Sequence, residues 1–233
     1  MAGMPMPGGW TMTMVWMRMP GQTWPGAALA FVEMWAVMMA VMMLPALIAM
    51  LRPYRAAIVV GGLLHAWRPL VLASAGYFVV WLLVGLALFP LGAVFATVTM
   101  HQPALARVVP ILAGVCVVLA GGVQFTRWKV HQLASCGELS AHGPGAEAAG
   151  AEAGAAWRHG LHLGVRCARC CGNLMAILLA VGLMDLAVMT VVTVGITAER
   201  FAPTDAGRVR RIGAVAVGAG VVMLIQVVVQ RFS

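Results

Sequence analysis

The chain has 233 residues, of which 62% are hydrophobic and 9% are charged, and its formal net charge is +8. Its mean hydropathy is +0.95. A soluble domain carries about 25% charged residues, so this composition excludes an ordinary soluble fold. The positive charge does not indicate nucleic-acid binding, because the arginines lie mainly at the ends of apolar runs, where they anchor transmembrane helices. We therefore expect an integral membrane protein.

Apolar runs of about 20 residues cross a bilayer as helices, because the backbone must form its own hydrogen bonds in hydrocarbon. The sequence contains five such runs, over residues 27–51, 70–97, 108–125, 172–197 and 212–229. They predict an all-α, polytopic bundle of about five spans within residues 26–233. Residues 137–156 are rich in Gly, Ala and Glu, which is typical of a flexible linker.

Five spans place the two ends of the chain on opposite sides of the membrane. Nine of the Lys and Arg residues then lie on the side of the C-terminus and six on the side of the N-terminus. The positive-inside rule favours a cytoplasmic C-terminus, although the cluster of Arg208, Arg210 and Arg211 argues for the reverse. We expect a multi-pass protein of the bacterial inner membrane.

Residues 1–25 form a segment rich in Met and Trp, and we predict that they make an interfacial arm. Thirteen of the eighteen methionines fall within the first fifty residues, and six of them form three M-x-M pairs in this arm. Thioethers are soft ligands that select Cu(I), and the short spacing lets two of them reach one ion. Met12 and Met14 are the candidate ligands, since the arm has little core for such side chains to fill.

A second group of methionines lies in the first predicted helix. Met34, Met38 and Met42 repeat every four residues, which places them on one face of a helix. Such a row either conducts a soft metal ion or provides adaptable packing, and the pattern fits both.

The strongest metal motif is a C-x-x-C-C cluster formed by Cys167, Cys170 and Cys171. At the start of a helix, the spacing i, i+3, i+4 places three sulfur atoms on one face. The positive N-terminal end of the helix, together with Arg166 and Arg169, would favour the thiolate, which is the form that binds metal. The alternative is that these thiols pack at the interface or carry palmitate.

The other two cysteines are separate from this cluster. Cys136 precedes the predicted linker and is a candidate fourth ligand, because a loop of that length costs little free energy to close. Cys116 lies alone in an apolar run, where a cysteine usually packs like a small hydrophobic residue.

Three acidic residues lie in or at the ends of predicted spans. Glu33 is near the start of the first, Asp185 is in the middle of the fourth, and Glu199 is at the end of the fourth. A carboxylate at membrane depth normally faces a partner, a cavity or an ion path. Asp185 is either functional or a hydrogen-bonded structural acid, and the alternative for Glu199 is a simple interfacial ion pair with the adjacent Arg200.

Three motifs give the chain a likeness to a known family. They read Trp35, Met38, Met39, Met42, Met43 and Pro45; then Lys129, Gln132, Leu133 and Cys136; then Gly164, Cys167, Cys170, Cys171, Leu174 and Met175. The chain resembles a bacterial family of predicted metal-binding integral membrane proteins, and the likeness covers most of its length. It departs from that family at Gln132, where a cysteine is usual, and at Asn173, where an aromatic residue is usual. The resemblance implies metal binding but no settled reaction.

Two functions fit these observations. In the first, the protein binds copper as Cu(I), or less readily zinc, and collects, passes or delivers it within the lipid bilayer. In the second, it is a noncatalytic accessory subunit of a larger membrane complex, such as a copper enzyme. We expect no enzymatic activity, because the sequence has no G-x-S-x-G, phosphate loop or H-E-x-x-H motif.

Overall fold

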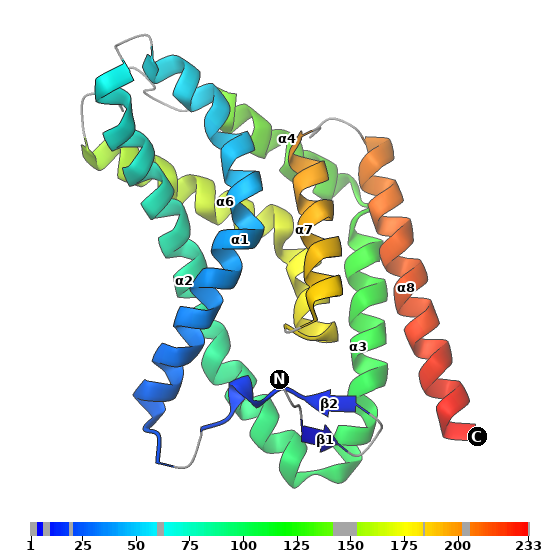
Figure 1. Ribbon diagram of the computed structural model, residues 1–233. Helices are drawn as coiled ribbons and strands as arrows, with labels where there is room; N and C mark the ends of the chain where they lie inside the picture. The colour runs from blue at the N-terminus through cyan, green and yellow to red at the C-terminus, as the bar shows by residue number, and fades with distance from the viewer. Residues whose placement is uncertain are drawn as a thin grey trace.

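The computed structural model describes residues 4–6, 10–18, 21–59, 63–141, 153–183, 185–201 and 206–232. Within these residues the chain forms a short hairpin followed by seven α-helices (Figure 1). The elements are β1 (Met4–Met6), β2 (Trp10–Met12), the 3-10 turn η1 (Met14–Trp16), α1 (Trp24–Val59), α2 (Leu63–His101), α3 (Pro103–Val123), α4 (Arg127–Ala141), α6 (Ala153–Val181), α7 (Leu186–Phe201) and α8 (Ala206–Phe232).

Five of these helices contain a segment long and apolar enough to cross a membrane. The segments are Trp24–Arg52, Trp67–His101, Pro103–Val123, Ala153–Val181 and Ala206–Gln230. The prediction of an all-α, polytopic bundle is therefore confirmed. The short helix α4 is absent from the prediction, because it is not apolar and hydropathy alone does not reveal it.

The fourth predicted span, over residues 172–197, is wrong in its bounds. The chain instead forms two helices, α6 and α7, joined by a turn in which Gly182 has a φ of +140°. Asp185 starts the second helix, because its Oδ1 accepts hydrogen bonds from the backbone N–H groups of Ala187 (2.9 Å) and Val188 (3.1 Å). Both sides of the turn are apolar, so hydropathy merges them into one run.

The two ends of the bundle differ in character. The start of α2, all of α4, the end of α7 and the start of α8 lie at one end, which we call the basic end (Figure 1). The strands β1 and β2, the connection from α2 to α3 and the end of α8 lie at the other, which we call the hairpin end. Helices α6 and α7 leave the basic end and return to it. The first strand and the end of the last helix therefore lie at the same end of the bundle, whereas five crossings would place them at opposite ends.

Small residues let the helices approach closely. A Cβ atom on Gly160 of α6 would collide with the backbone of Ala73 in α2, and one on Gly76 of α2 would collide with the carbonyl oxygen of Trp157 in α6. Close helix contact through small residues is typical of membrane proteins. This crossing sets the position of α6, which carries the cysteine cluster.

The hairpin is antiparallel, with Met4 opposite Met12 and Met6 opposite Trp10. The indole Nε1 of Trp10 donates a hydrogen bond to the carbonyl oxygen of Ala106 in α3 (2.9 Å). The predicted arm is therefore docked against the helices over its described residues. Met6 and Met12 are both buried, so the expectation that the arm has little core to fill is wrong.

Candidate metal site

The cysteine cluster lies in the middle of α6 and not at a helix start. Helix α6 begins at Ala153, and its first half carries polar residues such as Arg158 and His162. The charge at a helix end falls off within the first turn. The predicted contribution of the helix N-terminus to the cysteines is therefore wrong, and any favourable charge must come from neighbouring side chains.

Two of the three sulfur atoms face each other. The Sγ atoms of Cys167 and Cys171 are 3.7 Å apart, and both side chains are completely or almost completely buried. The hydroxyl group of Tyr77 in α2 donates a hydrogen bond to Cys167 Sγ (3.1 Å). These two cysteines, which we call the sulfur pair, form a site with two soft donors enclosed between α2 and α6.

The third sulfur atom points elsewhere. The thiol of Cys170 donates a hydrogen bond to the carbonyl oxygen of Gln132 in α4 (3.3 Å). Successive residues of a helix are rotated by about 100°, so Cys170 and Cys171 point toward different neighbours. The predicted convergence of three sulfur atoms is wrong in this respect. Within the described part of the chain, no group of three or more His, Cys, Asp and Glu side chains is arranged to hold a metal ion.

A positive charge lies beside the sulfur pair. Arg200, at the end of α7, donates a hydrogen bond from Nη2 to Cys171 Sγ (3.3 Å), and its side chain is only 9% exposed. Arg200 therefore contacts sulfur, and the expectation that it simply pairs with Glu199 is wrong.

Glu199 instead forms a buried ion pair with Lys129 of α4. The Nζ atom of Lys129 lies 2.9 Å from Glu199 Oε2, and both side chains are at most 1% exposed. Gln124 Nε2 donates a second hydrogen bond to the carboxylate (2.6 Å to Oε1). Lys129 also donates to the carbonyl oxygen of Cys170 (2.5 Å) and to Asn173 Oδ1 (3.0 Å). Burial of a charge costs free energy unless it is paired and hydrogen-bonded, so this cluster fixes the ends of α3, α4 and α7 against the cysteine helix.

The other two predicted acids lie outside this site. Glu33 is an exposed residue of α1. Asp185 is also exposed and caps α7, so its predicted placement in the middle of a helix is wrong. Its role in the structure is to satisfy backbone N–H groups that a helix start leaves without partners.

The methionines of α1 belong to the same hydrophobic core as the three cysteines of α6. Met38 and Met42 are buried, and Met34 is half-buried against this core. Met39 and Met43, each one residue after a member of this row, are buried as well. The row thus faces the interior of the bundle, which fits packing and metal transfer equally.

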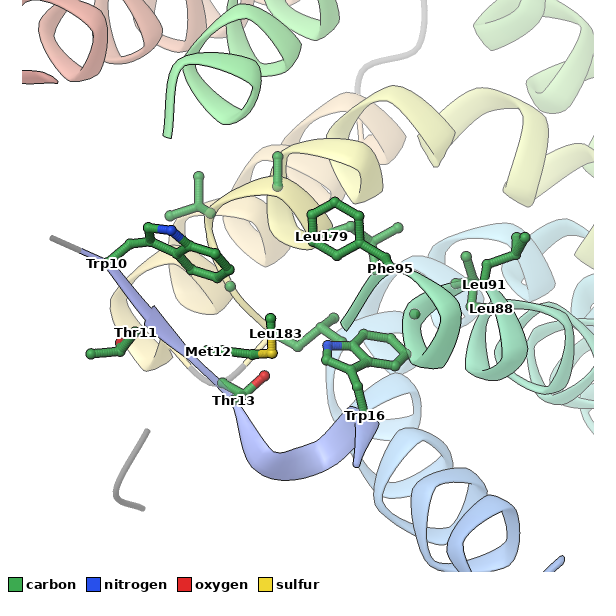
Figure 2. Close-up of a pocket in the computed structure, with 14 residues that line it drawn as sticks. Trp10, Thr11, Met12, Thr13, Trp16, Leu88, Leu91, Phe95, Leu179 and Leu183 are labelled. Atoms are coloured by element: carbon green, nitrogen blue, oxygen red, sulfur yellow. The ribbon is translucent and has the colours of Figure 1, made fainter. Parts of the chain in front are cut away.

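The remaining predicted ligands fall in three places. Met12 lines a cavity of about 300 Å³ between the hairpin, α2 and the turn from α6 to α7. Figure 2 shows its thioether projecting between the rings of Trp10 and Trp16 toward Leu183. The side chains of Cys136 and Met14 lie outside the described residues. Cys116 is half-buried, and its Sγ lies 4.0 Å from the carbonyl oxygen of Ala176 in α6, as expected for a packing residue.

Sequence reasoning missed two neighbours of the cysteines, Tyr77 and Arg200, and the hydrogen bond from Gln124 to Glu199. Tyr77 is one of two tyrosines in the chain and interrupts an apolar run, and this rarity was the available signal. Asn173, noted as a departure from the family pattern, also proves to have a partner in Lys129.

Comparison with known proteins identifies the family of the chain. No curated protein and no solved structure matches the chain. A family model described as PpoB2, copper chaperone, matches residues 32–223. The matched region includes the α1 methionine row, the sulfur pair, Arg200 and the buried ion pair, and it leaves out the hairpin. Because the match covers more than half of the sequence, the chain belongs to the PpoB2 copper chaperone family.

Proposed function

We propose that the protein carries copper as Cu(I) inside a membrane and that Cys167 and Cys171 hold the ion. The observation that carries this proposal is the separation of 3.7 Å between two buried Sγ atoms. Thiolate sulfur is a soft ligand that suits Cu(I). Membership of a copper chaperone family makes copper the cargo that best fits such a pair.

The spacing of the sulfur pair suits one ion bound by both atoms. With metal–thiolate bonds of about 2.3 Å, sulfur atoms at this separation subtend an angle of about 105° at the ion. The same angle leaves room for another ligand to approach. A two-thiolate site of this kind is able to pass its ion to a third sulfur donor by exchange, which is what a chaperone requires.

Arg200 supplies the charge that such a site needs. Two thiolates and one Cu(I) ion carry a net charge of −1, and an unpaired charge inside the bundle would cost several kcal/mol. The guanidinium group already contacts Cys171 Sγ, so it balances that charge. Tyr77 adds a hydrogen bond to the other sulfur.

The α1 methionines offer a route to the sulfur pair. They share its hydrophobic core and bind Cu(I) without losing a proton. A thioether binds Cu(I) more weakly than a thiolate does, so transfer from the methionine row to the cysteines would be downhill in free energy.

The test is to compare Cys→Ser variants of the purified, reduced protein. Each is loaded with Cu(I) without oxygen, separated from free metal by gel filtration and assayed for copper by elemental analysis. We expect the double variant Cys167→Ser/Cys171→Ser to retain less copper than the unchanged protein by the one ion of the sulfur pair, because both soft donors of that pair are gone. Cys170→Ser and Cys116→Ser should keep it, since neither sulfur belongs to the pair.

These two variants are matched controls, as each removes one sulfur atom from the same bundle. Equal copper retention by the double variant and by the unchanged protein would refute the proposal. A loss confined to Cys170→Ser would assign the ion to a different site.

A further inference from the structure

The register of the N-terminal hairpin gathers three methionines on one face. Met4 and Met6 are two residues apart on one strand, and Met12 lies directly opposite Met4 on the other. Residues i and i+2 of a strand share a face, and so do directly opposed residues, whose Cβ atoms lie about 5 Å apart. Met6 is the diagonal neighbour of Met12, within reach of a long side chain.

This face is turned toward the helices. Met6 is 8% exposed and Met12 is 3% exposed, whereas Thr11, between Trp10 and Met12 on the second strand, is exposed. Met6 and Met12 pack with Ala96 of α2 and Ala106 of α3. Met4 is only half-buried, so the group remains reachable from the edge of the hairpin.

We propose that Met4, Met6 and Met12 form a second binding site for Cu(I), which we call the thioether face. Three neutral, soft donors suit Cu(I) and do not suit Zn²⁺ or Ca²⁺, which prefer imidazole, thiolate or oxygen. Met14, our other candidate in the arm, lies beyond the strand in η1.

The position of the thioether face gives it a role in uptake. Met12 also lines the cavity beneath the turn from α6 to α7, where Trp10 and Trp16 flank its sulfur atom (Figure 2). An ion held on the hairpin is thus next to this cavity, which is partly open. Binding at the thioether face stands by itself; only its role as the entry point for the sulfur pair rests on the proposed function.

The experiment uses the full chain in the Cys167→Ser/Cys171→Ser background, which removes the sulfur pair. Cu(I) is titrated into the purified protein against a coloured Cu(I) chelator, and the amount bound is read from the absorbance. We expect one exchangeable Cu(I) site in this background and its loss in Met4→Leu/Met6→Leu/Met12→Leu. Binding should persist when the pH falls from neutral to mildly acidic, because a thioether has no proton to gain.

Leucine keeps the volume and apolar character of methionine, so the hairpin should stay docked. Met4→Leu alone changes only a half-buried residue and should weaken the site. Met100→Leu removes an exposed thioether at the end of α2 and is the matched control that should leave binding unchanged.

Equal binding by the triple variant and its background, or loss of binding in mild acid, would overturn the thioether face. The sulfur pair is judged separately, by comparing the unchanged protein with the background.

Discussion

Arg200 is the residue through which the electrostatics of the sulfur pair can be tested. Its guanidinium donates to Cys171 Sγ, and hydrogen bonds to charged groups contribute about 1.5–3 kcal/mol. We expect Arg200→Met to lower Cu(I) affinity by about tenfold or more. Arg200→Lys should fall between, because it keeps the charge and loses the planar donor geometry. Affinity is measured by competition with a Cu(I) chelator.

The control for this prediction is Arg166→Met, which removes an exposed arginine of α6 that donates to Ser135. Thermal unfolding of each variant shows whether the fold persists. If Arg200→Met folds and binds Cu(I) as tightly as the unchanged protein, the proposal that Arg200 balances the charge of the Cu(I)-loaded sulfur pair is wrong.

At the residue scale, the sequence predicts the sulfur atoms better than their surroundings. The spacing of Cys167 and Cys171 indicates a shared face, because helical geometry within one turn is local. Tyr77 and Arg200 could not be assigned to the site, since they reach it from α2 and α7 through tertiary packing. The direction of Cys170 likewise depends on the presence of α4.

At the element scale, the crossing of α2 and α6 can be tested with one added methyl group. Gly160→Ala would place its Cβ against the backbone of Ala73, so the helices must separate. We expect a loss of about 1–3 kcal/mol in stability, together with weaker Cu(I) binding as Tyr77 moves away from Cys167. Thermal unfolding and Cu(I) competition measure the two effects.

The control lies in the same helix. A Cβ on Gly172 meets no atom within 4 Å, so Gly172→Ala should be neutral or stabilising by up to about 1 kcal/mol from helix propensity. Equal destabilisation by both substitutions would show that the loss of stability does not come from the close contact between α2 and α6 at Gly160.

The existence of the long helices could be predicted from hydropathy, but two boundaries could not. The polar residues in the first half of α6 lower its hydropathy without interrupting the helix, so its start is missed. The turn at Gly182 leaves hydropathy high on both sides, so one run appears where the chain forms two helices. Because the two helices appear as one apolar run, the sequence places Asp185 inside a span, whereas in the structure it caps α7.

At the scale of the whole molecule, the return of α6 and α7 to the basic end changes how the charges are distributed. The start of α8, with Arg208, Arg210 and Arg211, lies at the same end as the last part of α1, with Arg52, and the start of α4, with Arg127. Among the Lys and Arg residues whose side chains the structure describes, Arg18 and Arg107 are the ones at the hairpin end. The conflict in the predicted charge count thus depends on whether α6 and α7 together make one crossing or return to the side from which they start.

The positive-inside rule then predicts that the basic end faces the cytoplasm and that both ends of the chain face outward. We expect a membrane-impermeant maleimide to label Thr11→Cys and Gln230→Cys in intact cells, because both positions are exposed at the hairpin end. Arg210→Cys, exposed at the basic end, should react only after the cells are permeabilised. The buried native thiols of the sulfur pair should react little, and the protein without added cysteine measures that background.

Labelling of Thr11→Cys and Gln230→Cys from opposite sides would restore the five-crossing topology. Labelling of Arg210→Cys alone in intact cells would reverse the orientation, and the thioether face would then meet copper from the cytoplasm.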